Sequence, residues 1–336
     1  MNQTPAAAAE SVSKSVVDGL LAKGTRRQLT PLSTDPEIRF PYLHLEAWGE
    51  GKSGKTDLGL RARTHEIRAP GKPSASGFGT EPGEVLIPSK PLVIAYANFD
   101  RDPATVVVNL PADVEIIEEP LYLDENDEPY AYVGPVEVDR ILKRLDEFFN
   151  EVDGVVDLVV LDGATIIWED VRTVKLGDPA GTDPDGNPHH LPRQYGPANA
   201  EMRSRVMQRF YGLRAHTYVT HEASEKWASA SGPVLDASGN AVLRMDGWNK
   251  TKHYIDVGGQ MKIAQVAGQA AGSVKAERQF ICDLSVNAAM IGQRVANPSF
   301  SGLYQRTYPK VPLLKREDRE EFDRLQKEHE GKLTWT

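Results

Sequence analysis

The sequence predicts an α/β protein in which a mostly parallel, twisted sheet is flanked by helices. Three observations lead to this fold class. The run Leu92–Ala97 is continuously apolar, as expected of a strand buried on both faces. Residues 136–152 repeat apolar side chains every three or four positions, as in an amphipathic helix. That helix leads into a second apolar run, Val155–Leu161, and alternation of helices with buried strands is typical of parallel sheets.

The other N-terminal elements are expected in the following order. Residues Tyr42–Ala47 form an apolar strand between a proline and a glycine cluster. Spaced apolar residues predict a helix over 57–69, which ends before a Pro-Gly pair. Residues 70–90 are rich in Gly, Pro and Ser and predict a surface loop, and Val114–Ile117 is a short additional strand.

The C-terminal half begins with residues 175–199, whose density of Gly and Pro predicts a long insertion. A helix over Ala198–Leu213 and a strand over Ala215–Thr220 are expected next, and residues 228–247 form a hairpin or a loop. The last expected elements are two strands and a highly charged helix, at Ile255–Val257, Gln279–Leu284 and Lys315–Gly331.

These elements predict one core with two different ends. Residues 1–38 are expected to be a flexible N-terminal arm, and packing on a neighbouring subunit is the alternative. Residues 39–295 form the α/β core, with a mobile insertion near 170–200. Residues 296–336 form a charged helical tail.

The composition excludes several classes of protein. No apolar run approaches the ~18–20 residues that span a bilayer, so no membrane partner is expected. The single cysteine, Cys282, rules out an internal disulfide framework and fits a reducing cytoplasm. The formal charge of −9 restricts any contact with nucleic acid to a local basic surface. The histidines lack metal-ligand spacing.

One motif carries specific chemistry. Residues 49–56 match G-x-x-x-x-G-K-[ST], a phosphate-binding loop between a strand and a helix. Backbone N–H groups of such a loop surround a polyphosphate, its lysine reaches the β- and γ-phosphates, and its hydroxyl ligates Mg²⁺. The motif predicts a Mg²⁺–ATP site formed by Gly49, Glu50, Gly51, Lys52, Ser53, Gly54, Lys55 and Thr56.

A second element complements this loop. The apolar strand ending at Leu161 is followed by Asp162, which we expect beside the strand of the phosphate-binding loop. A carboxylate there would hold the Mg²⁺ shell together with Thr56. The alternative is an ordinary aspartate in the turn after a buried strand. The next residue is Gly163, so the glutamate that many ATP-driven machines place at this point is absent.

The order of these motifs resembles the RecA-like P-loop ATPases, especially the compact recombination-associated ATPases encoded by bacteriophages. The resemblance spans roughly residues 40–290, and only the phosphate-binding loop within it is highly specific. It implies a catalytic base just after the strand over 92–97, where Asp100 is the first candidate and Asp102 the second. The family usually has glutamate at this position. A plain strand-end turn is the alternative.

The same resemblance implies two further roles. Thr220 and His221, at the end of the strand over 215–220, occupy the position of a polar group that senses the γ-phosphate, and His221 is the candidate site residue. Lys250 and Lys252 lie where RecA-like rings offer a cation to the nucleotide of the neighbouring subunit. The alternatives are a strand-end histidine and solvated loop lysines.

The resemblance therefore implies an ATP hydrolase that acts on single-stranded DNA in recombination, replication or repair. It implies a homo-oligomeric ring or filament in the host bacterial cytoplasm. A candidate DNA surface is the helix near 198–214, with Arg203, Arg205, Arg209 and Arg214. The main alternative is a nucleotide-bound structural or assembly protein with little turnover, associated with a ring or a virion. The third possibility is a small-molecule or nucleoside kinase. Such an enzyme would need a lid with several arginines, and the 170–200 insertion carries few basic residues.

Overall fold

The computed structural model describes residues 40–74, 80–99, 109–130, 133–176, 195–229, 232–237, 239–267 and 274–336. It divides into two units, Met1–Pro41 and Tyr42–Thr336, and every element below belongs to the second. The predicted N-terminal arm and most of the predicted insertion therefore lie outside the described residues.

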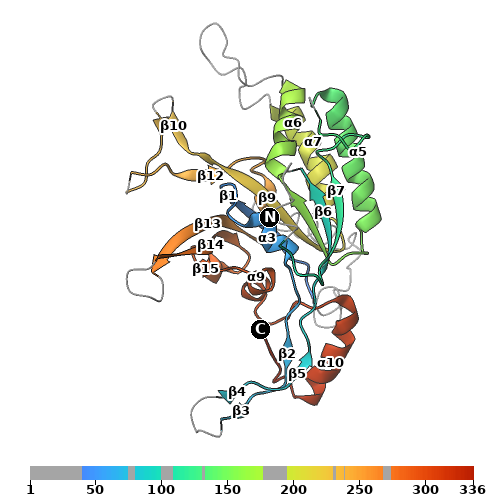
Figure 1. Cartoon of the computed structure of the whole chain (residues 1–336), viewed down its shortest axis with the longest axis vertical. Coiled ribbons are helices and arrows are strands. Elements are labelled where there is room, and N and C mark those ends of the chain that lie inside the picture. The colour runs from blue at the N-terminus through green and yellow to red at the C-terminus, as the bar shows by residue number, and fades with distance from the viewer. Residues whose placement is uncertain are drawn as a thin grey trace, which may run out of the picture. The chain divides into compact units, whose positions relative to one another are not determined.

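A nine-stranded sheet dominates the described part of this unit (Figure 1). Its order is β15–β14–β13–β1–β9–β8–β6–β7, with β12 paired to β9. The run from β13 to β7 is parallel, whereas β12, β14 and β15 pair antiparallel. The bounds are β1 His44–Gly49, β6 Val93–Asn98, β7 Glu115–Pro120, β8 Leu158–Asp162, β9 His216–Glu225, β12 Leu243–Met245, β13 Val257–Ala267, β14 Val274–Ser285 and β15 Arg294–Ala296. The predicted α/β class with a mostly parallel sheet is confirmed.

Helices cover both faces of this sheet (Figure 1). On one face, α5 and α6 pack with a continuous helical segment made of α7, η2 and α8, and η2 is a π-helical stretch. On the other face lie α3 and α9, with a second hydrophobic cluster beneath them. The bounds are α3 Lys55–Leu60, α5 Pro135–Val152, α6 Ala164–Leu176, α7 Gly196–Glu201, η2 Met202–Met207, α8 Gln208–Phe210 and α9 Phe300–Thr307.

Helix α5 follows directly from its sequence and confirms the predicted amphipathic helix. Pro135 begins the helix, and the Glu137 carboxylate accepts a hydrogen bond from the Gly134 N–H at 3.0 Å. Its apolar stripe is buried against the sheet and the neighbouring helices. The buried residues are Val138, Ile141, Leu142, Leu145, Phe148, Phe149 and Val152.

The helix predicted over 57–69 is wrong beyond residue 60. After α3 the Leu92 N–H donates to the Ala62 carbonyl, and the Thr64 N–H donates to the Lys90 carbonyl. The chain therefore continues in an extended form beside residues 90–92. Ala62 is buried beside residues 90–92, and Ile67 is buried where it pairs with Ile87 and Trp335. Both are buried in extended chain, which explains why their apolar spacing imitated a helix.

The loop predicted over 70–90 also contains strands. Short strands β3 (Lys72–Pro73) and β4 (Thr80–Glu81) pair antiparallel. A separate three-stranded sheet has the order β16–β2–β5, with bounds Thr334–Trp335, Ile67–Arg68 and Val85–Ile87. Helix α10 (Arg319–Glu328) is the predicted charged C-terminal helix, and its Phe322 ring packs against Trp335.

The C-terminal strands are longer than the sequence predicts. Strand β13 extends ten residues past Val257, and β14 runs antiparallel to it along its whole length. The Gly258-Gly259 pair marks an irregularity in the pairing of these two strands. Neither α6 nor α9 was predicted, and the residues over 228–247 contribute β10 (Trp227–Ser229), β11 (Gly232–Pro233) and β12.

Truncation of the buried α5 ring should destabilise the fold strongly. Phe149 is 1% exposed, and its ring packs on Phe148 and Phe210. We expect Phe149→Ala to lower the free energy of unfolding by about 3–5 kcal/mol, because a cavity replaces the ring. Val136→Ala on the same helix is the control, since Val136 is 65% exposed and should change stability by less than about 0.5 kcal/mol. Urea denaturation measures both, and equal losses would contradict this packing.

Stability should fall in acid through a buried histidine. The Nδ1 atom of His65 accepts a hydrogen bond from the Leu313 N–H at 2.7 Å, and Nε2 donates to the Ser301 carbonyl at 3.0 Å. Burial lowers the pKa of His65 from 6.5 to about 4. Because the unfolded chain binds the proton first, this contribution is complete above pH 6.5 and is lost as the pH falls toward 4.

The measurement is urea denaturation of wild type and His65→Gln between pH 7.5 and 4.5. The variant should be less stable at pH 7.5, and its stability should depend less steeply on pH below 6.5. The difference in slope should approach one proton, or about 1.4 kcal/mol per pH unit. Parallel curves would show that His65 does not titrate with folding.

Candidate functional site

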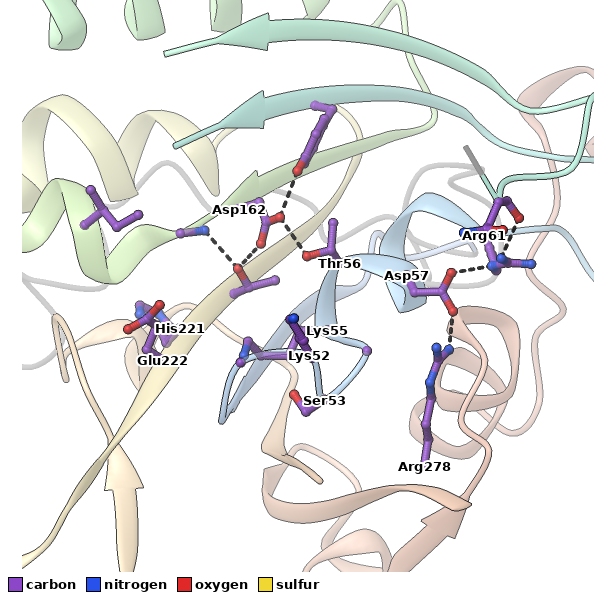
Figure 2. Close-up of a pocket in the computed structure, with 17 residues that line it drawn as sticks. Lys52, Ser53, Lys55, Thr56, Asp57, Arg61, Asp162, His221, Glu222 and Arg278 are labelled. Carbon is purple, nitrogen blue, oxygen red and sulfur yellow. Dashed lines mark hydrogen bonds and ion pairs between the residues drawn. The ribbon is translucent and has the colours of Figure 1, made fainter. Parts of the chain in front are cut away.

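The predicted phosphate-binding loop joins β1 to α3 at the carboxyl end of the sheet (Figure 2). Gly49 ends the strand, where a Cβ would lie 2.1 Å from the Met261 carbonyl oxygen, so only glycine fits. Gly54 precedes the helix with a φ of 91°, a conformation that favours glycine. Helix α3 has only six residues, so the loop's N–H groups matter more here than a helix dipole.

Lys55 closes over its own loop. Its ammonium donates hydrogen bonds to the carbonyl oxygens of Gly49 and Glu50, each at 2.8 Å. The Tyr218 hydroxyl of β9 donates to the Lys55 carbonyl at 2.8 Å and fixes the start of α3 against the sheet. Burial, with a smaller effect from Asp162, raises the pKa of Tyr218 well above its usual value, so this hydroxyl stays protonated as a donor.

Asp162 lies at the centre of a hydroxyl cluster. It is 4% exposed, and its Oδ2 accepts hydrogen bonds from the Thr56 hydroxyl and the Tyr96 hydroxyl, both at 2.8 Å. Its Oδ1 accepts a hydrogen bond from the Thr220 hydroxyl. Thr220 Oγ1 also accepts from the Gly163 N–H at 2.9 Å. The carboxylate therefore connects the loop, β6, β8 and β9.

The expectation that Asp162 would lie on the strand next to the loop strand is wrong in one respect. Strand β9 separates β8 from β1. Asp162 nevertheless reaches Thr56, because β9 carries the small Thr220 between them and donates to the same carboxylate. The two predicted Mg²⁺ ligands are thus brought together, although their strands are not neighbours.

These two side chains fit the coordination preferences of Mg²⁺. This ion takes oxygen ligands and is usually held by one or two protein oxygens, with phosphates and waters completing its shell. A hydroxyl beside a carboxylate, next to a phosphate-binding loop, is such a donor set. Within the described residues no group of three or more His, Cys, Asp or Glu side chains forms a dedicated metal site.

His221 lies on the opposite face of β9 from Thr220, because side chains alternate along a strand. It is 0% exposed, and its Nε2 lies 3.5 Å from Oε2 of the buried Glu46 on β1. In the described structure neither ring nitrogen of His221, nor Glu46 Oε2, makes a hydrogen bond. The imidazole is therefore buried at the wall of the site rather than exposed in it.

A cavity of about 780 Å³ surrounds the loop and reaches from Asp162 to two arginines, Arg61 and Arg278. Figure 2 shows these arginines on either side of Asp57, whose carboxylate pairs with both. The other lining residues are Gly51, Lys52, Ser53, Gly54, Lys55, Thr56, Tyr96, Asn109, Gly163, Ile166, Thr220, His221 and Glu222.

The remaining predicted site residues lie elsewhere. Asp100 and Asp102, the candidate bases, fall outside the described residues. Lys250 and Lys252 are exposed around a short 3₁₀ turn and do not line the cavity. The preceding Trp248 anchors this turn, since it is buried and its indole N–H donates to Asn199 at 2.9 Å.

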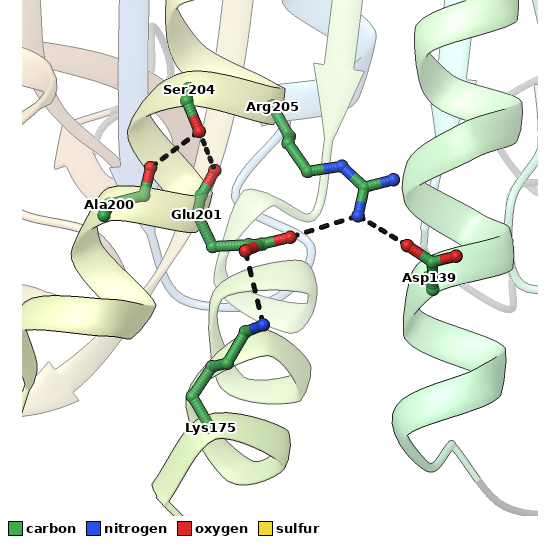
Figure 3. Close-up of polar contacts among 6 residues, drawn as sticks. All are labelled: Asp139, Lys175, Ala200, Glu201, Ser204 and Arg205. Carbon is green, nitrogen blue, oxygen red and sulfur yellow. Dashed lines mark hydrogen bonds and ion pairs between the residues drawn. The ribbon is translucent and has the colours of Figure 1, made fainter.

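The candidate DNA surface on α7–α8 is largely neutralised by helix α5. Figure 3 shows Arg205 between Asp139 of α5 and Glu201 of its own helix, with nitrogen–oxygen distances of 2.6 and 3.0 Å. Arg209 pairs with Asp146, and Arg214 pairs with Asp153 just after α5. These three arginines hold two helical segments together and offer less charge to a DNA strand than the sequence suggested.

Sequence reasoning missed three residues of the site. Tyr96 lies within an apolar run that predicts a buried strand, but its hydroxyl, two residues before the strand's carboxyl end, is a usable signal. Arg61 follows Asp57 by four positions, so their i,i+4 spacing was a usable signal. Arg278 had no local signal, because it meets Asp57 from 221 positions away in the chain.

No protein-family model matches this chain, and no curated protein matches it either. Of the helices in the described residues, none combines the length and apolar character needed to cross a bilayer.

Removal of one hydroxyl should destabilise the Asp162 cluster. Thr220→Val keeps the shape of the side chain but leaves Asp162 Oδ1 and the Gly163 N–H without this partner. We expect the free energy of unfolding to fall by about 1–3 kcal/mol. Thr334→Val, at an exposed position in β16, is the control and should cost less than about 0.5 kcal/mol. Equal stabilities of the two variants in urea would argue against the cluster.

Proposed function

We propose that this chain is a RecA-like P-loop ATPase that binds Mg²⁺–ATP and acts on single-stranded DNA in recombination, replication or repair. The observation that carries the proposal is the 2.8 Å hydrogen bond between Thr56 of the loop and Asp162 at the end of β8. It joins two motifs that lie 106 positions apart in the chain and that ATP chemistry requires together.

Each group of the site has a part in this proposal. The N–H groups of the loop surround the β-phosphate, and Lys55 exchanges its bonds to Gly49 and Glu50 for bonds to phosphate oxygens. Thr56 and Asp162 would hold Mg²⁺, which would supply charge neutralisation at the phosphates. Tyr96 and Thr220 orient the Asp162 carboxylate through their hydroxyls.

The proposal extends to a homo-oligomer, as in the family that the sequence resembles. Lys250 and Lys252 are exposed and lie away from the cavity of their own chain. This location is compatible with delivery of a cation to a neighbouring subunit's nucleotide.

A second candidate function is a nucleotide-bound assembly protein with little turnover, associated with a ring or a virion. The paired state of Arg205, Arg209 and Arg214 favours it, because these cations are engaged with acidic side chains around α5. In that function the nucleotide would stabilise the fold or the assembly without being consumed quickly.

An ATPase assay with and without single-stranded DNA separates the two functions. For the ATPase we expect Mg²⁺-dependent phosphate release that rises with single-stranded DNA. Lys55→Ala should reduce this activity by about 100-fold or more, because it removes the cation that contacts the transferred phosphate. Lys310→Ala, which changes an exposed lysine outside the cavity, is the matched control and should retain wild-type activity.

Other outcomes would redirect the proposal. Tight Mg²⁺–ATP binding without turnover, together with nucleotide-dependent assembly in gel filtration, would favour the assembly protein. Stoichiometric transfer of phosphate to a metabolite would contradict both functions. Absence of any Mg²⁺–nucleotide binding would contradict the phosphate-binding assignment itself.

A further inference from the structure

A second cavity, of about 450 Å³, adjoins the phosphate-binding loop. It shares four lining residues with the first cavity, namely Gly54, Asp57, Arg61 and Arg278. Its other walls come from α3, β13, the segment after β15 and the start of α9, and consist of Leu58, Met261, Asn297, Pro298, Ser299 and Phe300. The two cavities therefore meet at the Arg61–Asp57–Arg278 group.

Arg278 is positioned at this junction by both its backbone and its side chain. Its carbonyl accepts a hydrogen bond from the Asn297 N–H at 2.7 Å, which fixes β14 beside residue 297. Its guanidinium lies over Gly54, so close that a Cβ on Gly54 would be 2.8 Å from Nε. Asp57 holds one end of the guanidinium, while the side chain remains 49% exposed.

The orientation of a bound nucleotide would follow from the side chains that bind its phosphates and its Mg²⁺. Lys55 would attract the β- and γ-phosphates, and Thr56 and Asp162 would hold the Mg²⁺ that accompanies them. The α-phosphate and the nucleoside must then extend away from Asp162. In that direction the first cavity extends past Asp57 to Arg61 and Arg278, and the second cavity adjoins it at these residues.

The chemistry of this second cavity suits a nucleobase better than another phosphate. Asp57 offsets part of the charge of the two arginines, which leaves flat guanidinium surfaces of modest net charge. Such a surface stacks on aromatic rings. Phe300 is buried, so the arginines supply the flat surfaces that a ring could reach. Asn297 is exposed beside them and carries both a donor and an acceptor for the edge of a base.

We propose that the second cavity receives the nucleoside end of the nucleotide, with Arg278 lying against the base and Asn297 meeting its polar edge. This inference rests on the proposed function. Arg278 is then a specificity-determining residue: it selects a nucleoside triphosphate over an inorganic polyphosphate of equal charge.

Two probes test this assignment by calorimetry on the full chain. One is the Mg²⁺ complex of a non-hydrolysable ATP analogue, and the other is Mg²⁺–tripolyphosphate, which lacks a nucleoside. Arg278→Ala should weaken binding of the ATP analogue about tenfold and leave tripolyphosphate binding within about twofold. Asn297→Ala should act in the same direction with a smaller effect. Arg294→Ala, on neighbouring β15 and outside both cavities, should bind both probes like wild type.

The outcomes are distinguishable. Unchanged affinity of Arg278→Ala for the ATP analogue, or an equal loss for both probes, would overturn the inference and leave the phosphate site intact. Binding of neither probe by wild type would overturn the proposed function. If thermal unfolding shows that Arg278→Ala does not fold, Asn297→Ala decides with the same probes, and unchanged analogue binding there overturns the inference.

Discussion

A single buried carboxylate organises this molecule. Asp162 is removed from solvent, and an unpaired charge in such a place would be very costly. Three hydroxyl donors offset that cost, one each from Thr56, Tyr96 and Thr220. They belong to the phosphate-binding loop, to β6 and to β9. Asp162 therefore helps to hold the loop over the carboxyl end of the sheet, together with the Tyr218 hydroxyl that donates to the Lys55 carbonyl.

Much of the site was predictable because its chemistry is local in the sequence. Residues 49–56 form one contiguous loop, and Asp162 follows an apolar strand directly. Tyr96 and Arg278 differ because their roles come from tertiary contacts. A tyrosine in an apolar run looks like core until its hydroxyl is seen to meet Asp162. Arg278 lies at the site only because the fold places β14 beside the loop, and no periodicity in the sequence predicts that contact.

The fold shows the same division between local and distant information. Helix α5 was predicted because its apolar stripe, its proline and its capping glutamate agree with one another. The helix over 57–69 was predicted wrongly because residues 62–64 pair with residues 90–92, and this non-local pairing overrides the apolar spacing. Similarly, the net charge of −9 does not predict which arginines are paired. Acidic side chains in and just after α5 form ion pairs with Arg205, Arg209 and Arg214.

The position of β1 also has a consequence for the order of folding. This strand carries the phosphate-binding loop, yet it is paired on both sides by strands from much later in the chain. The Leu43 N–H donates a hydrogen bond to Nδ1 of His216, which is 173 positions later in the chain. The His44 N–H donates to the Asp256 carboxylate, which is 212 positions later. Such non-local pairing forms slowly, because closing a long loop of chain costs conformational entropy before the new contacts offset that cost. During synthesis the loop sequence emerges early, but its strand has no partners until most of the core has been made. We therefore expect the proposed nucleotide site to be among the last parts of the protein to form.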